Sequence, residues 1–282
     1  MSKVAVVGAG TMGNGIAHTF AQHGWSAALI DVSDDALGRG LATIKQNLER
    51  LEKKGAISHQ LSADTLGRIK TSTSLEAAKD AEIVVEAVSE NPDIKFEVFA
   101  ALRRLTPPQT ILASNTSSIS IAELAKHTDR PGNVIGMHFM NPVPVMKLVE
   151  VIRGRETSND TVKRTVEIVQ ELGKTAVEVN DAPGFVSNRV LMPMINEAIF
   201  CVQDGIATAE GVDQVMTLGM KHPLGPLALA DLIGLDVCLA ILDVMVEGFA
   251  DPKYRPARLL KEMVASGRLG RKSGVGFHVY RD

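Results

Sequence analysis

Short, continuous apolar runs alternate with helical patterns through the first half of the chain. The runs lie near residues 4–8, 27–31, 83–87, 110–113, 134–137 and 148–152. Runs that are apolar throughout, rather than at every second position, predict strands covered on both faces. Between most of them, apolar residues recur with helical spacing, at 12–23, 33–54, 92–104 and 159–172. Strands and helices in this alternation predict a parallel sheet with right-handed crossovers, an α/β architecture.

The pattern changes after residue 180. Asp181-Ala182-Pro183-Gly184 is a turn cluster, and only helical patterns follow it, near 185–204, 208–219, 225–248 and 256–266. We therefore predict an α/β domain over residues 1–183 and an all-helical domain over residues 184–282. The apolar stripe of the first of these helices is broad, so we expect part of its surface to pack against another domain or subunit.

The helical pattern at 33–54, with the segment 58–69 behind it, is longer than a simple crossover needs. It carries Arg50, Lys53 and Lys54 at its end. Cations at a helix C-terminus are explained by the helix dipole alone. The alternative is a helical arm, over about 33–69, that projects from the sheet and whose basic end binds a phosphate-bearing ligand.

Charge and cysteine content argue against several partners. Thirty basic and 33 acidic side chains give a net charge of −3, so no overall field favours nucleic acid or an anionic membrane. Cys201 and Cys238 lie in apolar helical patterns without metal-ligand spacing, which predicts buried thiols and no metal site. No apolar run approaches the roughly 18 residues of a membrane helix. Because a strand pattern begins at residue 3, we expect no signal peptide and a cytoplasmic location.

A glycine-rich turn follows the first strand directly and opens the first helix. It reads Gly8-Ala9-Gly10-Thr11-Met12-Gly13, and a strand–turn–helix setting makes this G-x-G-x-x-G pattern typical of dinucleotide binding. Gly8 permits the tight turn, Gly10 leaves room for a pyrophosphate, and Gly13 lets the helix pack closely on the strand. The backbone amides of Thr11–Gly13 and the positive end of the helix are then placed to bind the phosphate groups of the dinucleotide. The expected fold is a Rossmann-type doubly wound, mostly parallel sheet with a projecting helical arm, followed by an all-α domain.

Asp31 ends the second strand. An acid at this position accepts hydrogen bonds from both ribose hydroxyls and repels a 2′-phosphate, which favours NAD over NADP. FAD uses the same kind of turn and is the main rival. However, the second half of the chain shows no further flavin motif and no second βαβ unit. The sequence therefore predicts NAD as the cofactor.

Polar side chains occur at or near the ends of three later strands. Ser114-Asn115-Thr116-Ser117-Ser118 follows one strand, His138 closes another, and Glu150 interrupts the apolar run at 148–152. Each has an ordinary explanation, as a turn, a structural histidine or an edge-strand acid. Ligands of open parallel sheets bind at the carboxyl ends of strands, so Ser117 and His138 are expected near the cofactor. Together they suggest a His–carboxylate pair that removes an alcohol proton during hydride transfer.

In combination these motifs resemble one family over the full length of the chain: the 3-hydroxyacyl-CoA dehydrogenases, particularly the bacterial 3-hydroxybutyryl-CoA dehydrogenases. The similar blocks fall in the family's order. Besides the glycine turn they are residues 114–118, 136–144, 181–189, 222–227 and 270–277.

The resemblance implies roles for individual residues. His138 would be the catalytic base for alcohol oxidation and the acid for ketone reduction, with Glu150 orienting and supporting it. Ser117 and Asn188 would hydrogen-bond the reacting oxygen or the thioester carbonyl. The implied further cofactor contacts are Glu90, Lys95, Asn115, Ser117, Asn141 and Lys272. Arg50 and Lys54 match the region where the family's helical arm meets the CoA phosphates.

The implied reaction is NAD-dependent oxidation of a (S)-3-hydroxyacyl-CoA to the 3-oxoacyl-CoA and its reversal, with a short acyl chain. The family also dimerises through its helical domain, so we expect a homodimer. One alternative is a related dehydrogenase of small free hydroxyacids, but those usually carry a catalytic lysine on the first helix of the second domain, and residues 184–203 contain none. Others are a gulonate-type dehydrogenase and a nucleotide-binding structural protein, since a lens crystallin resembles this family.

Overall fold

The computed structural model describes residues 2–280, which divide between Ala182 and Pro183 into two compact units. The first unit contains one eight-stranded sheet in the order β3-β2-β1-β4-β5-β6-β7-β8. Its strands are β1 (Lys3–Val7), β2 (Ser26–Ile30), β3 (Ile69–Ser72), β4 (Ile83–Glu86), β5 (Ile111–Ser114), β6 (Val134–Phe139), β7 (Leu148–Arg153) and β8 (Thr175–Asn180). Neighbouring strands are parallel except for β6 and β7, so the predicted mostly parallel sheet is confirmed.

The sequence pattern missed the two outer strands, β3 and β8. Each lies at an edge of the sheet and has one paired neighbour. Most residues of both strands are exposed or partly exposed, and their sequences, IKTS and TAVEVN, contain polar residues. An edge strand needs no continuous apolar run, because only part of its surface is covered.

Helices pack on the sheet as the alternating pattern requires. They are α1 (Thr11–Gln22), α4 (Pro92–Leu105), α5 (Ile121–Ala125) and α6 (Asn159–Glu171), with short 3₁₀ turns η1 (Leu75–Ala78) and η2 (Pro131–Asn133). Phe20 of α1 and Ile168 of α6 belong to the same buried apolar cluster as Val6 of β1 and Val151 of β7. This cluster fixes the start of α1 against the end of β1, where the glycine turn lies.

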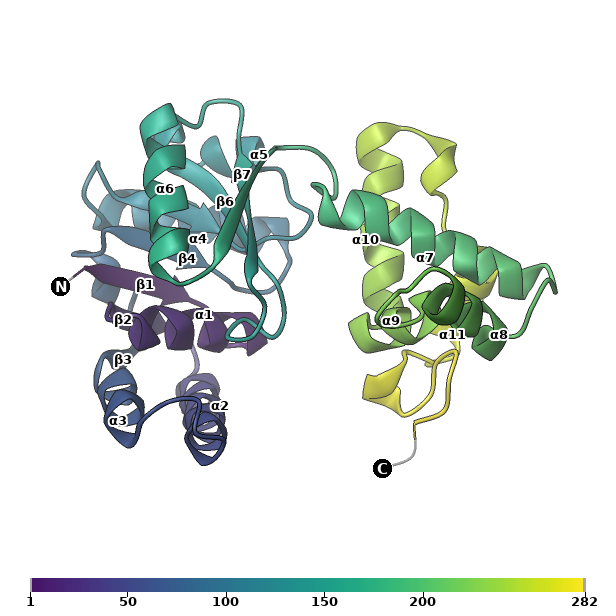
Figure 1. Ribbon diagram of the computed structural model, residues 1–282. Coiled ribbons are helices and arrows are strands. Elements are labelled where there is room, and N and C mark those ends of the chain that lie inside the picture. The colour runs from purple at the N-terminus through teal and green to yellow at the C-terminus, as the bar shows by residue number, and fades with distance from the viewer. Residues whose placement is uncertain (1, 281–282) are drawn as a thin grey trace. The chain divides into compact units, whose positions relative to one another are not determined.

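The predicted helical arm consists of α2 (Asp34–Lys53) and α3 (His59–Gly67), which lie next to each other on the far side of α1 from the sheet (Figure 1). Ser33 caps α2 by accepting a hydrogen bond from the Ala36 amide. The buried residues of α2 recur at helical spacing, at Leu37, Gly40, Ile44 and Leu48. One face of α2 therefore packs inward, while the end that carries Arg50 stays exposed.

The second unit is helical, as predicted. It comprises α7 (Ser187–Gln203), α8 (Ala209–Gln214), a π-helical turn η3 (Val215–Gly219), α9 (Pro226–Ile233), α10 (Leu235–Phe249), η4 (Pro252–Tyr254), α11 (Arg258–Ala265) and η5 (Arg271–Ser273). The pattern at 225–248 predicted one helix, and this was wrong. Gly234 has a φ of +106°, outside the helical region, so the chain turns there and starts a second helix.

The segment that ends the second unit is held by a buried carboxylate. Asp231 of α9 is 1% exposed and accepts hydrogen bonds from the amides of Phe277 and His278, at 2.9 Å each, and from the Tyr280 hydroxyl at 3.1 Å. His278 Nε2 also lies 2.8 Å from Asp213 Oδ2. These contacts give fixed positions to a segment with little regular structure.

Candidate active site

The glycine turn has the shape that a pyrophosphate needs. Gly8 has a φ of +104°, and a Cβ there would lie 2.5 Å from the carbonyl oxygen of Ala87. A Cβ on Gly13 would collide with the carbonyl oxygen of Gly8, whereas a Cβ on Gly10 would meet no atom within 4 Å. Gly10 also precedes α1 without a side chain that could occupy the amides of the first turn. The turn is closed toward the protein and open toward a ligand, and the residues present fit a dinucleotide.

Asp31 lies directly beside this turn, one residue past the end of β2. Its Oδ2 accepts a hydrogen bond from the Ala9 amide at 2.8 Å, and its Oδ1 accepts one from the Ser33 amide at 3.1 Å. These two bonds fix the carboxylate next to the phosphate cradle. Each oxygen has a second lone pair, so the group can still accept hydrogen bonds from ribose hydroxyls.

His138 and Glu150 face each other across the antiparallel pair β6–β7, where they are register partners. His138 Nδ1 lies 2.8 Å from Glu150 Oε2. The two side chains are 12% and 3% exposed. An ionised carboxylate can only accept a hydrogen bond, so opposite one a neutral imidazole carries its proton on Nδ1 and has Nε2 as the acceptor nitrogen. A buried carboxylate at this distance also stabilises positive charge on the ring.

Glu90 organises the loop that carries Ser117. Its Oε1 accepts hydrogen bonds from the Thr116 hydroxyl at 2.6 Å and from the Ser117 amide and hydroxyl at 2.8 and 3.2 Å. The Ser118 amide and hydroxyl donate to the same oxygen at 3.1 and 2.9 Å. Burial raises the pKa of Glu90, but the Lys95 charge and these hydrogen bonds outweigh it and hold the pKa below its usual range. An ionised Glu90 therefore acts as the acceptor around which residues 116–118 are ordered.

Lys95 lies behind Glu90 in a buried network. Its Nζ is 2.7 Å from Glu86 Oε1 and 3.3 Å from Glu90 Oε2, and Glu86 Oε2 accepts a hydrogen bond from the Ser114 hydroxyl at 2.6 Å. The side chains of Lys95 and Glu86 are 1% and 0% exposed. The ammonium group is therefore held inside the protein against two carboxylates, and its contact with the loop at Ser117 runs through Glu90.

The other predicted residues lie in several places. Asn115 accepts a hydrogen bond from the Phe139 amide at 2.9 Å, which ties the Ser117 loop to the residue after His138. Asn141 is exposed on the loop after β6, and Arg50 and Lys54 are exposed at the end of α2. In the second unit, Asn188 is buried in the first turn of α7, and Lys272 forms an ion pair with Asp236 at 2.5 Å.

Sequence reasoning missed Glu86 and Lys174. Glu86 ends the apolar strand β4, as Asp31 follows β2, so an acid after an apolar run was an available signal. Lys174 follows α6, and nothing in the local sequence distinguishes it from a surface lysine. Its contacts depend on a loop about thirty residues earlier in the chain.

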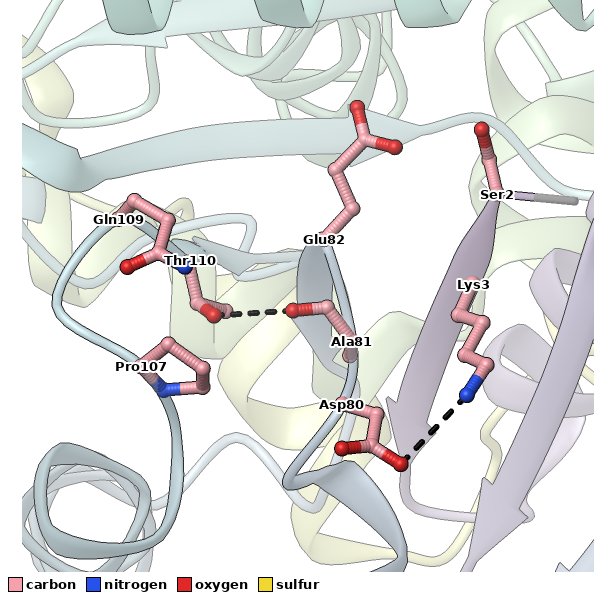
Figure 2. Close-up of a pocket in the computed structure, with 8 residues that line it drawn as sticks. All are labelled: Ser2, Lys3, Asp80, Ala81, Glu82, Pro107, Gln109 and Thr110. Atoms are coloured by element: carbon pink, nitrogen blue, oxygen red, sulfur yellow. Dashed lines mark hydrogen bonds and ion pairs between the residues drawn. The ribbon is translucent and has the colours of Figure 1, made fainter.

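A cavity of about 530 Å³ lies at the amino ends of β1, β4 and β5, whereas the glycine turn follows the carboxyl end of β1. Figure 2 shows its polar lining, in which Lys3 pairs with Asp80 at 3.5 Å and the Thr110 hydroxyl donates to the Ala81 carbonyl oxygen at 2.9 Å. Ligands of such sheets bind at the carboxyl ends of the strands.

Within residues 2–280 no group of three or more His, Cys, Asp or Glu side chains is arranged to hold a metal ion, and no helix is long and apolar enough to cross a bilayer.

A doubly wound sheet with this glycine turn defines a dinucleotide-binding domain, and an acid after the second strand is typical of domains that bind NAD. Residues 3–182 match the family model described as 3-hydroxyacyl-CoA dehydrogenase, NAD binding domain, and residues 184–280 match that of the 3-hydroxyacyl-CoA dehydrogenase C-terminal domain. The chain belongs to the 3-hydroxyacyl-CoA dehydrogenase family. It is an oxidoreductase, and its cofactor is NAD, as the glycine turn and Asp31 predicted.

Individual relatives match the whole chain. A probable 3-hydroxybutyryl-CoA dehydrogenase of Bacillus subtilis is 54% identical over 282 residues, which are 100% of this chain and 98% of the relative. The crystal structure of (S)-3-hydroxybutyryl-CoA dehydrogenase from Ralstonia eutropha has a TM-score of 0.97 and 50% identity, with 100% of both chains covered. A 3-hydroxyadipyl-CoA dehydrogenase of Escherichia coli is 40% identical and covers 100% of this chain with 59% of its own length.

Proposed function

We propose that the chain oxidises short-chain (S)-3-hydroxyacyl-CoA to 3-oxoacyl-CoA with NAD and catalyses the reverse reduction, with His138 as the proton acceptor and donor. The observation that carries the proposal is the 2.8 Å contact between His138 Nδ1 and Glu150 Oε2 in the unit that matches the NAD-binding family model. The alcohol must lose its hydroxyl proton as its C3 loses hydride, and a histidine with one nitrogen fixed by a carboxylate suits this transfer.

Glu150 determines which imidazole nitrogen exchanges a proton with the substrate. It keeps the Nδ1 proton in place, so Nε2 accepts the 3-hydroxyl proton during oxidation and returns a proton to the ketone oxygen during reduction. The ring becomes an imidazolium in the first case, and the buried carboxylate offsets that charge. Glu150 is thus a positioning residue that acts through His138.

The glycine turn would hold the dinucleotide by its backbone amides, with Asp31 at the adenosine ribose. Further contacts with the cofactor would come from Glu90, Lys95, Asn115, Ser117, Asn141 and Lys272, with Lys95 acting through Glu90. Bound NAD supplies the hydride acceptor for C3. The Ser117 loop follows β5 next to β6, so Ser117 can approach a substrate oxygen near His138.

Residues 1–183 would bind the cofactor, and residues 184–282 would contribute Asn188 to the substrate and form the homodimer contact. Exposed apolar side chains on α7 and η3 support an association surface, for example Val190 at 67% and Leu218 at 82% exposure. The exposed basic end of α2 supports a role for Arg50 and Lys54 at the CoA phosphates.

The relatives' names support a short acyl chain. Those at 48–54% identity include 3-hydroxybutyryl-CoA dehydrogenases, which favours a four-carbon acyl group. The decisive experiment mixes the protein with NADH and acetoacetyl-CoA and follows the nicotinamide absorbance. Free acetoacetate tests the hydroxyacid alternative, and longer and dicarboxylic 3-oxoacyl-CoA substrates test the chain length. No turnover with any 3-oxoacyl-CoA would overturn the proposal, and it would favour a structural role.

A further inference from the structure

The loop 140–147 connects the two strands that carry His138 and Glu150. Lys174, in the turn between α6 and β8, donates hydrogen bonds from Nζ to two carbonyl oxygens of this loop. They belong to Val143, at 2.6 Å, and Met146, at 2.7 Å. Both strands of the pair therefore connect to a loop that one ammonium group holds at two points.

Lys174 is an unusual residue for this position. It is 9% exposed, and burial lowers the pKa of its ammonium group. Within residues 2–280 it forms no salt bridge, so its contacts are with carbonyl dipoles. Burying a cation costs free energy unless hydrogen bonds compensate it. An apolar side chain would fill the same space without the cost of burying a charge. What the lysine adds at this position is the pair of hydrogen bonds to the loop.

The loop is fixed from the other side by the nucleotide-binding helix. Val143 is 2% exposed and packs against Gly15 of α1, where a Cβ would lie only 2.9 Å from the Val143 Cβ. The Thr175 amide donates to the Lys147 carbonyl oxygen at 2.7 Å and extends the β7–β8 pairing to the end of the loop. Lys174 thus clamps a segment that already contacts the helix at the cofactor turn.

We infer that Lys174 is a positioning residue, which holds loop 140–147 so that His138 and Glu150 keep their catalytic geometry relative to α1. The inference rests on the proposed function of the pair. Misplacement of a catalytic group by about 1 Å can cost on the order of a hundredfold in rate. The glycine turn lies outside this loop, and only Asn141 of the loop is a proposed cofactor contact, so the affinity for NADH should change less than kcat.

The test replaces Lys174 by Met, which keeps most of the side-chain volume and removes the hydrogen bonds. Lys147→Met is the matched control, because Lys147 is exposed on the same loop. We expect K174M to lower kcat for acetoacetyl-CoA reduction by about tenfold or more, with a smaller change in KM for NADH. Amide hydrogen exchange in residues 141–147 should accelerate in K174M and stay unchanged in K147M. If K174M does not fold, Lys174→Gln, which removes the charge and shortens the side chain but keeps a donor, should show the same changes to a smaller degree.

The outcomes separate this inference from the function on which it rests. An active wild type with equal kcat in K174M and K147M would overturn the role of Lys174 and leave the proposed function standing. Faster exchange without loss of kcat would also overturn it, because Lys174 would then be merely structural. An inactive wild type would overturn the proposed function, and the inference would fall with it.

Discussion

The Lys95 ammonium group lies 2.7 Å from the Glu86 carboxylate, and both side chains are almost completely buried. The pair connects β4 to the second turn of helix α4 and lies directly behind the Glu90 carboxylate that orders the Ser117 loop. Removal of one partner leaves a charge in an environment that cannot solvate it. The stability of the fold and the order of the site are therefore linked at this point.

Lys95→Met should lower the free energy of unfolding by about 3–5 kcal/mol, as is usual when one partner of a buried ion pair is removed. Urea denaturation measures the change. Lys126→Met is the control, since Lys126 and Glu123 form an exposed pair at 2.6 Å, and its loss should cost less than about 1 kcal/mol. If the two substitutions lower the free energy of unfolding equally, the buried ion pair of Lys95 contributes no more to stability than an exposed pair.

His138→Gln should reduce turnover at least about a hundredfold, the lower end of general-base effects, while NADH binding stays nearly unchanged. Glu150→Gln should also reduce kcat, because an amide cannot offset the imidazolium charge. The chain offers a matched control in His59, which lies 2.9 Å from Glu52 on the exposed helical arm. His59→Gln should leave kcat unaltered. Unchanged turnover in H138Q would remove the basis of the proposed mechanism.

His18 predicts a specific loss of stability in acid. It lies in α1 with 0% exposure, and burial lowers its pKa from 6.5 to about 4. The unfolded state then binds the proton more tightly than the folded state, so stability is full above pH 6.5 and falls as the pH drops toward 4. For these two pKa values the loss between pH 7 and pH 5 is about 2 kcal/mol.

The measurement compares urea denaturation of the wild type and His18→Gln at both pH values. The variant lacks this titration, so its free energy of unfolding should fall by about 2 kcal/mol less than that of the wild type between pH 7 and pH 5. Carboxylates titrate equally in both proteins and cancel in the difference. Parallel pH dependence of the two proteins would mean that His18 reaches solvent when protonated.

The sequence predicted those parts of the fold that local patterns encode. Continuous apolar runs identified six buried strands, and the glycine turn gave the cofactor. The reversal of β7 was not encoded locally, because an apolar run such as 148–152 has no direction. Likewise β3 and β8 take their strand form from pairing with β2 and β7, and their own residues are largely polar.

For the candidate site, sequence motifs supplied the residue types, and the structure supplied their pairing. That His138 is opposite Glu150 follows from the antiparallel register of β6 and β7, which depends on the length and path of loop 140–147. The family resemblance implied that Lys95 contacts the cofactor. Its burial against Glu86 depends instead on how two strands and a helix pack together in the fold. Local sequence cannot show such a partnership, because residue type alone does not determine burial.

Arg50→Ala with Lys54→Ala should raise KM for acetoacetyl-CoA several-fold, because two exposed charges near a phosphate contribute on the order of 0.5 kcal/mol each. KM for NADH should not change. Lys45→Ala is the control, since Lys45 is exposed on the same helix but lies farther from its C-terminal end. Titration with free CoA at two salt concentrations would show whether the difference is electrostatic. Equal KM values in the double variant and the control would place the CoA phosphates elsewhere.

Asp31→Asn should weaken the preference for NADH over NADPH. The amide keeps an oxygen that can accept the Ala9 amide hydrogen bond, so the turn should stay intact, but the charge that repels a 2′-phosphate is lost. A hydrogen bond to a charged group contributes about 1.5–3 kcal/mol, so KM for NADH should rise by roughly tenfold or more. The ratio of kcat/KM for NADH to that for NADPH measures the effect, with Asp34→Asn in the first turn of α2 as a control. A ratio that stays at the wild-type value would mean that Asp31 serves only to fix the turn through Ala9 and Ser33.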